Sequence, residues 1–156
     1  MYGLHLSVGR VAVFTAQGFG VGRSPVAPGT FGTLIGLPLV WLQSSFDPLL
    51  AVMFAVAFGL FAVPVAGTAA RYLNSDDDGS IVIDEIAGYL VAMIAVPLTP
   101  WSIVAGFVLF RCFDIIKPPP IGLLERKIKG GAGIVADDIV AGIMTNMVLQ
   151  AGMWWL

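Results

Sequence analysis

Charged residues, cysteine and histidine are all scarce in this sequence. Asp, Glu, Lys and Arg make up 12% of its 156 residues, against roughly 25% in soluble globular proteins. Cys112 and His5 are each alone of their kind, which excludes an internal disulfide and leaves no plausible zinc ligand set. The net charge of −2 is too small to indicate a nucleic-acid partner.

Apolar residues take the place of the missing charges. They make up 58% of the chain, and the mean hydropathy is +0.91. A soluble core of this length could not bury so much apolar surface. The sequence therefore predicts an all-α integral membrane protein that forms one domain over residues 1–156. The N-terminus lacks a charged region followed by a long apolar run and a cleavage site, so we expect no cleaved signal peptide.

Residues 1–30 form a region distinct from the rest. Its first part fits an amphipathic helix lying on a surface, and fits a strand almost as well. Its second part, GFGVGRSPVAPGTFGT from Gly18, is rich in glycine and proline, which predicts a shaped loop.

Five apolar segments follow, and we expect them to form a polytopic helical bundle. They cover residues 31–46, 48–70, 81–98, 101–116 and 134–156. A helix needs about 20 residues to cross a hydrocarbon core of ~30 Å. The second and fifth segments are long enough, whereas the first and fourth are short and could either cross or re-enter. We expect about five crossings.

The basic residues predict how such a bundle is oriented. If all five segments cross, the N-terminal region shares one side with the loops at 71–80 and 117–133. The basic residues on that side are Arg10, Arg23, Arg71, Lys117, Arg126, Lys127 and Lys129. The opposite loops carry none, so the basic side is expected to be cytoplasmic. The other side carries tryptophans that suit an outer membrane interface, namely Trp101, Trp154 and Trp155.

Five acidic residues fall at one depth in this topology, near the cytoplasmic boundary. They are Asp84, Glu85, Asp114, Asp137 and Asp138. An ionised group within a membrane costs several kcal/mol unless it is paired or hydrated, so such groups usually mark function. The plainer alternative is that interfacial acids merely pair with Arg111 and Lys117, and Arg111 and Asp114 have the spacing of a helical ion pair.

Carboxylates at an aqueous mouth suit Mg²⁺, which takes oxygen ligands and is often shared with a substrate phosphate. Adjacent acids point about 100° apart on a helix. We therefore expect one member of Asp84/Glu85 and one of Asp137/Asp138 to bind the metal, and the sequence does not say which.

Several cations and one loop could bind a phosphate. The cationic candidates are Arg23, Arg111, Lys117 and Lys129. For Lys129 we prefer attraction to anionic lipid headgroups. The loop at 18–30 could present backbone N–H groups to a phosphate, or it could be only a glycine-rich connector.

Four blocks occur in order: GFGVGRSPVAPGTFGT, IVIDEIAGY, FRCFDIIKPPP and GGAGIVADDIVAG. Together they resemble the phosphatidylglycerophosphatase A family of bacteria, over most of the chain. The resemblance implies a small enzyme of the bacterial cytoplasmic (inner) membrane with its active site facing the cytoplasm. It implies removal of the terminal phosphate of phosphatidylglycerophosphate with Mg²⁺ to give phosphatidylglycerol.

The resemblance also implies which residues form the site. Its acidic positions are the five named above, its basic positions are Arg111 and Lys117, and its N-terminal loop supplies Pro28, Gly29 and Thr30. We expect Asp84, Glu85, Asp137 and Asp138 to supply the metal ligands. The expected catalytic residues are Asp114 as general base, Asp138, Arg111 and Lys117. The expected substrate-binding residues are Arg23, Pro28, Gly29, Thr30 and Lys129.

Several alternatives stay open on the sequence alone. Direct attack by water and a covalent aspartyl-phosphate are both compatible with these residues, as are one or more metal ions. The rival classes are a small ion or proton transporter and a non-enzymatic lipid-binding subunit. Small residues, including Ala55, Gly59, Ala66 and Gly67, allow either internal helix packing or a homodimer face.

Overall fold

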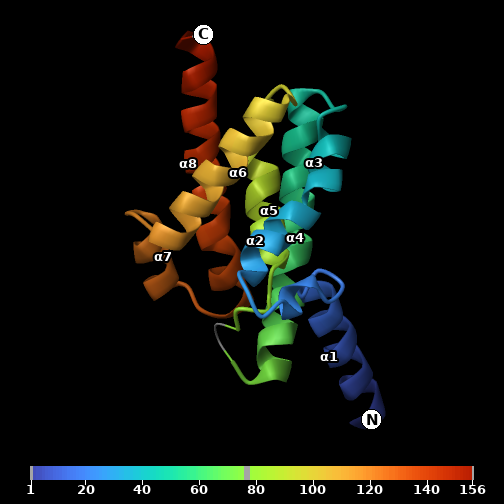
Figure 1. The fold of residues 1–156 in the computed structure, drawn as a ribbon. Helices are drawn as coiled ribbons and strands as arrows, with labels where there is room; N and C mark the ends of the chain where they lie inside the picture. Colours follow the sequence, from blue (N-terminus) through green and yellow to red (C-terminus); the bar gives the residue numbers. More distant parts are fainter. Residues whose placement is uncertain (1, 76–77, 156) are drawn as a thin grey trace.

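The computed structural model describes residues 2–75 and 78–155, and every regular element in these ranges is helical (Figure 1). The predicted all-α class is confirmed. The elements are α1 (Tyr2–Ala16), the 3₁₀ turn η1 (Val21–Arg23), α2 (Pro28–Ile35), α3 (Leu37–Gln43), α4 (Pro48–Leu73), α5 (Ile83–Ala92), α6 (Pro100–Ile116), α7 (Ile121–Lys127) and α8 (Gly130–Trp155).

Within the described ranges, two helices are long and apolar enough to cross a membrane, α4 and α8. Each has 26 residues, a length of about 39 Å. In their most apolar stretches only 28% and 39% of the residues are buried, so most of these side chains face outward. The helix of α8 begins at Gly130, one turn before the expected start, and the expected end at Leu156 lies outside the described residues.

The remaining apolar segments are shorter or broken. Residues 31–46 are not one helix as expected, because α2 ends at Ile35 and α3 begins at Leu37. Pro38 causes the break, since its ring cannot donate a hydrogen bond and clashes with the preceding turn. In residues 81–98 only α5 is helical, and the chain from 93 to 99 is irregular. Of the about five predicted crossings, the described residues therefore show two as unbroken helices of spanning length, α4 and α8.

The N-terminal helix settles the choice left open between helix and strand. The helix α1 packs against α4 through a buried side that includes Val13 and Ala16. Its outward side carries Val8, Val11 and Phe14, all about half exposed or more. Because both sides are apolar, α1 is less amphipathic than the sequence suggested.

The connectors gather at the two ends of the molecule as the expected topology requires. Figure 1 shows the N-terminus, the α4–α5 connector and the α7–α8 connector toward one end. The C-terminus and the turns from α3 to α4 and from α5 to α6 lie toward the other end.

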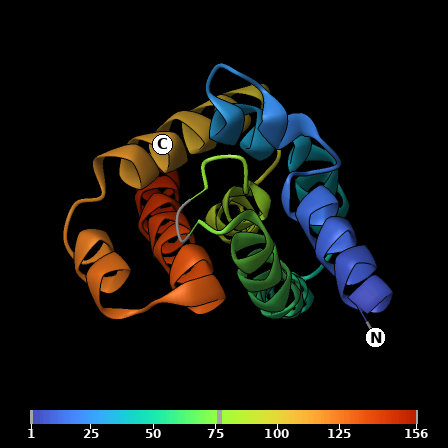
Figure 2. The ribbon, with the colours of Figure 1, turned by 90° about the horizontal axis from the view of Figure 1, so that it is seen from below.

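The short helix α5 lies in the middle of the other helices (Figure 2) and contacts α8, α4, α2, α6 and α3. Its side chains Tyr89 and Leu90 are fully buried. Two glycines bring its backbone against α8, because a Cβ on Gly142 would collide with the carbonyl oxygen of Gly88. This approach carries residue 138 of α8 to the first turn of α5.

A second close approach joins the two long helices. A Cβ on Gly67 of α4 would lie 3.2 Å from the Cα of Gly131 in α8. The small residues predicted to allow close packing are all buried inside the chain, namely Ala55, Gly59, Ala66 and Gly67. They serve internal packing, so they give no support to a homodimer.

Amides from α8 satisfy the backbone where α5 ends. The Asn146 Nδ2 donates to the carbonyl oxygens of Ala92 at 3.0 Å and Ile94 at 2.8 Å. Gln150 Nε2 makes longer bonds to Ile94 and Ala95, at 3.2 Å and 3.3 Å. Irregular backbone in an apolar surrounding is tolerated only when its polar groups find such partners.

We predict that Asn146→Leu lowers the thermal unfolding midpoint of the detergent-solubilised protein. The Ala92 carbonyl loses its side-chain donor and the Ile94 carbonyl keeps only the longer bond from Gln150, which should cost about 1–3 kcal/mol. Gln150→Leu is the matched control, and we expect a smaller shift because its bonds are longer. Equal midpoints for wild type and Asn146→Leu would show that these bonds do not hold the end of α5.

Candidate active site

The first turn of α5 carries two carboxylates that line a pocket. The helix begins at Ile83, after the backbone N–H of Val82 has bonded to the carbonyl oxygen of Ala16 at 2.8 Å. Asp84 and Glu85 therefore lie at a helix N-terminus, where the unpaired N–H groups favour negative charge. The N–H of Glu85 donates to Asp84 Oδ1 at 3.1 Å.

A third carboxylate, from Asp138 of α8, joins this pair. One oxygen from each of Asp84, Glu85 and Asp138 lies within 4.8 Å of the others. Glu85 Oε2 is buried without a hydrogen-bond partner, and Asp138 also lies within electrostatic range of Asp114. Crowded carboxylates with an unused buried oxygen fit a divalent cation that prefers oxygen ligands.

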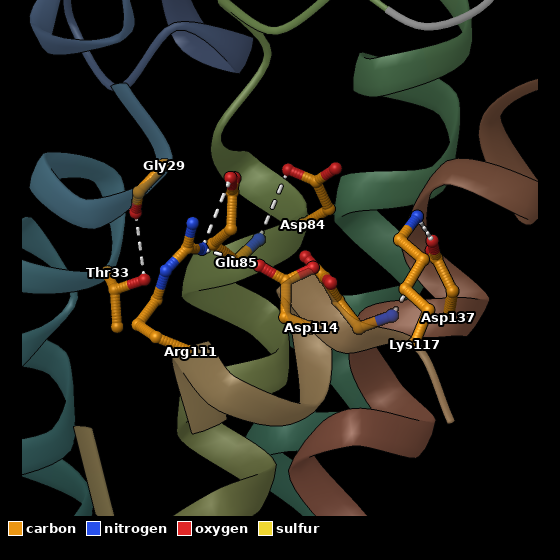
Figure 3. Close-up of polar contacts among 9 residues, drawn as sticks. Gly29, Thr33, Asp84, Glu85, Arg111, Asp114, Lys117 and Asp137 are labelled. Carbon is orange, nitrogen blue, oxygen red and sulfur yellow. Dashed lines mark hydrogen bonds and ion pairs between the residues drawn. The ribbon is translucent and has the colours of Figure 1, made fainter. Parts of the chain in front are cut away.

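Arg111, near the end of α6, lies between Glu85 and Asp114 (Figure 3). Its Nη1 is 2.6 Å from Asp114 Oδ2 and 3.6 Å from Glu85 Oε1, and its side chain is 14% exposed. The approach to Asp114 is an ion pair without hydrogen-bond geometry, and Nε is buried without a hydrogen-bond partner. The Arg111 guanidinium therefore has a buried N–H donor that neither acid satisfies.

Gly29 supports this arginine from the start of α2. A Cβ at position 29 would lie 2.9 Å from Arg111 Nη2 and 3.0 Å from Nη1, and would collide with Glu85 Oε1. The carbonyl oxygen of Gly29 also accepts a bond from the buried Thr33 hydroxyl at 2.9 Å. Gly29 is thus needed for space behind the Glu85–Arg111 pair (Figure 3).

Lys117 and Asp137 form a separate ion pair at the other side of the site. Lys117 ends α6 with a left-handed φ of 47°, and its Nζ bonds Asp137 Oδ2 at 2.6 Å. Asp137 and Asp138 are neighbours on one helix and point different ways. Asp138 therefore joins the carboxylate cluster. Asp137 instead faces the lysine (Figure 3).

The six acidic and lysine side chains described above line a pocket of about 390 Å³, within the usual range for small-molecule sites. Arg111 and Gly29 are not part of its wall. Its wall, as far as the structure describes it, is formed by Asp78, Gly79, Ile81, Asp84, Glu85, Asp114, Lys117, Ile128, Lys129, Gly130, Gly133, Ile134, Asp137 and Asp138. Carboxylates outnumber the two lysines in this wall, which leaves room for a cation as well as an anion.

The structure does not bring every predicted residue to the pocket. Lys129 lines it, whereas Pro28 and Thr30 are not part of its wall. The Arg23 side chain turns instead to Gln17, with its Nε 2.8 Å from Gln17 Oε1. Sequence reasoning missed Asp78, because it lies outside the four sequence blocks that carry the family resemblance.

A sequence model of one family, phosphatidylglycerophosphatase A, matches residues 14–153. The chain belongs to the phosphatidylglycerophosphatase A family. Membership confirms the predicted resemblance and assigns the chain to a family of phosphatases, which favours an enzyme over an ion transporter or a non-enzymatic subunit.

Relatives from three bacteria show how close the match is. The phosphatidylglycerophosphatase A of Escherichia coli is 40% identical over 139 residues, covering 86% of this chain and 78% of the relative. That of Haemophilus influenzae is 37% identical over 143 residues, covering 90% and 88%. A Bacteroides thetaiotaomicron protein named "putative phosphatidylinositol-3-phosphatase" is 35% identical over 150 residues, covering 91% and 93%. No solved structure matches the chain.

We predict that Gly29→Ala lowers kcat/KM for phosphate release about 10- to 100-fold, because the added methyl displaces the Glu85–Arg111 pair by a fraction of an ångström or more. The unfolding midpoint should change little, since both displaced groups are flexible side-chain ends. Gly152→Ala is the control, as a Cβ there meets nothing within 4 Å. Wild-type activity in Gly29→Ala would exclude this role for Gly29.

Proposed function

We propose that this chain is a Mg²⁺-dependent phosphatase of phosphatidylglycerophosphate. It hydrolyses the terminal phosphomonoester and leaves phosphatidylglycerol. The observation that carries the proposal is a pocket whose wall brings Asp84, Glu85 and Asp138 together with the ion-paired Lys117, in a chain of this family. The buried Arg111 adds a second cation, paired with two carboxylates of that wall, Glu85 and Asp114.

Asp84, Glu85 and Asp138 are the residues that would hold the metal. Their donor atoms are all carboxylate oxygens, which suits Mg²⁺. When bound, the ion neutralises charge on the phosphate oxygens and lowers the pKa of a bound water. Asp137, expected among the ligands, instead orients Lys117 through their 2.6 Å ion pair.

The chain's own cations bind the phosphate. Arg111 has a buried Nε without a hydrogen-bond partner, and a guanidinium binds phosphate oxygens through its planar fork. Lys117 lines the pocket opposite the carboxylate cluster and supplies a second positive charge. These fixed charges favour the transition state, in which negative charge spreads over the phosphoryl oxygens.

Asp114 is the proposed general base for the attacking water. It lines the pocket, and its ion pair with Arg111 at 2.6 Å keeps its carboxylate beside the group that binds phosphate. A general base must lie within hydrogen-bond reach of the proton it accepts, and a water bound between the phosphate and Asp114 would lie within that reach.

The name of the Bacteroides relative gives a second candidate substrate, phosphatidylinositol 3-phosphate. The two lipids share one chemical feature. In both, the phosphomonoester sits on a polyol carbon whose neighbour carries a free hydroxyl. We favour phosphatidylglycerophosphate because two of the three relatives carry that activity in their names.

The lipid substrate implies a membrane location, and we propose a multi-pass protein of the bacterial inner membrane with the pocket facing the cytoplasm. The length and outward apolar faces of α4 and α8 support this. At the end opposite the pocket, Trp101, Trp154 and Trp155 are 84–91% exposed, as expected for an interfacial aromatic belt. The α2–α3 pair and α5 with its irregular extension would cross as broken helices, which keeps the proposed count at about five.

Phosphate release from phosphatidylglycerophosphate in detergent micelles is expected to stop with EDTA and to return with Mg²⁺. Asp138→Asn should lower kcat/KM at least about 100-fold, because an amide replaces one anionic metal ligand. It should also abolish the rise in unfolding midpoint that Mg²⁺ produces in the wild type.

Two further variants make this test specific. Asp47→Asn is the matched control, because Asp47 caps α4 at the far end and asparagine caps equally well. Asp137→Asn should raise KM and keep the Mg²⁺-dependent stabilisation. If Asp137→Asn loses that stabilisation and Asp138→Asn keeps it, the metal assignment is wrong.

Single cysteines in a Cys112→Ser background test the orientation. Ser45→Cys, between α3 and α4, should react with a membrane-impermeant maleimide on intact cells. Lys127→Cys, beside the pocket, should react only after the cells are permeabilised. Both positions are exposed, so accessibility depends on the side of the membrane alone. The reverse pattern would contradict a cytoplasmic active site.

A further inference from the structure

Asp78 contributes a carboxylate to the pocket from outside the catalytic helices. It lies in the connector between α4 and α5 and lines the pocket wall, yet it is not among the three acids whose oxygens approach within 4.8 Å. Neither the proposed metal site nor the proposed phosphate site includes Asp78, so this carboxylate is left to bind another part of the substrate.

A chain of hydrogen bonds holds Asp78 in place. Its Oδ1 accepts from the Ser80 backbone N–H at 2.9 Å and from the Ser80 hydroxyl at 2.6 Å. Gln17 Nε2 donates to Ser80 Oγ at 2.8 Å, and Gln17 Oε1 accepts from Arg23 Nε at 2.8 Å. The glutamine is 4% exposed, so its amide is committed to these two partners.

The backbone of the N-terminal loop at Gly22 packs tightly against the α4–α5 connector. A Cβ on Gly22 would collide with the carbonyl oxygen of Ser80 and would lie 3.2 Å from Val82 Cγ1. The loop that carries Arg23 therefore fits against residues 80–82, between Asp78 and the first turn of α5. A connector held in this way keeps a fixed distance between Asp78 and the metal-binding acids.

The chemistry of the carboxylate limits what Asp78 can bind. Both donors of Ser80 use Oδ1, which leaves Oδ2 for the pocket. An ionised carboxylate only accepts hydrogen bonds, and it repels a phosphate. A partner on the substrate must therefore be a neutral or cationic donor, and the headgroups of both candidate lipids offer hydroxyls.

We propose that Asp78 accepts a hydrogen bond from the free hydroxyl next to the phosphomonoester in the polyol headgroup. Ser80, Gln17 and Arg23 are its positioning residues. The inference rests on the proposed function and deepens it, because it makes the enzyme selective for phosphates on a hydroxylated carbon chain. Glycerol and inositol headgroups both meet that requirement.

The test compares two lipids that differ in one hydroxyl. The first is phosphatidylglycerophosphate, and the second carries propanediol in place of the headgroup glycerol. A hydrogen bond to a charged group is worth about 1.5–3 kcal/mol, so the wild type should prefer the first lipid by roughly 10- to 150-fold in kcat/KM. Asp78→Ala should bring the two values within about threefold, by losing activity on the first lipid alone.

The positioning residues are tested by the same quantity, the ratio of kcat/KM for phosphatidylglycerophosphate to kcat/KM for the propanediol lipid. Gln17→Leu and Ser80→Ala should each lower the preference severalfold, and Ser80→Thr, which keeps the hydroxyl, should restore it. Ser75→Ala is the matched control, since this serine lies in the same connector outside the pocket wall. Unfolding midpoints are measured for each variant. If Asp78→Ala does not fold, the preference is compared between Ser80→Ala and Ser80→Thr instead.

The outcomes separate this inference from the function on which it rests. Equal wild-type activity on both lipids, or an equal loss on both in Asp78→Ala, overturns the role of Asp78 and leaves the phosphatase intact. No phosphate release from either lipid by a folded, Mg²⁺-replete wild type overturns both. Loss of the preference in Asp78→Ala and Gln17→Leu, with unchanged activity on the propanediol lipid, supports the inference.

Discussion

Gly88 and Gly142 allow the backbones of α5 and α8 to touch, since a Cβ on Gly142 would collide with the Gly88 carbonyl oxygen. A Cβ on Gly88 would in turn lie 2.5 Å from the carbonyl oxygen of Asp138 and 2.7 Å from Phe110 Cε2. This contact fixes the position of α5 along the axis of α8. It carries the Asp138 carboxylate to the first turn of α5, where Asp84 and Glu85 lie. The carboxylate cluster thus depends on two residues that have no side chain.

The cluster would be unfavourable without compensation, because like charges in a poorly hydrated place repel one another strongly. Arg111 provides part of the compensation through Glu85 and Asp114, and the helix N-terminus of α5 provides more. Glu85 Oε2 and Arg111 Nε nevertheless stay buried without hydrogen-bond partners. A site that leaves both an acceptor and a donor unmet is suited to a cation and an anion together, as a metal-assisted phosphatase requires.

The same bundle tolerates broken helices because polar side chains reach the broken ends. Asn146 and Gln150 bond to the backbone after α5, and Gln43 Nε2 donates to the Leu90 carbonyl oxygen at 3.0 Å. A short α5 has a functional consequence, since its N-terminus lies at the pocket and its C-terminus lies within the bundle. The helix can therefore present acids at its start without extending to the far end as an unbroken span.

Composition and motif order determined the helical class, the end of the molecule at which the acids gather, and the family. These properties depend on hydropathy and local spacing, which one sequence contains. The tertiary structure alone decided that Asp138 joins Asp84 and Glu85 while Asp137 turns to Lys117, because side-chain direction depends on how each helix is rotated against its neighbours. It also decided that the Arg23 side chain donates a hydrogen bond to Gln17. Gln17 in turn donates to Ser80, which is 63 residues away in the sequence. Such partners are set by long-range packing, which local patterns do not encode.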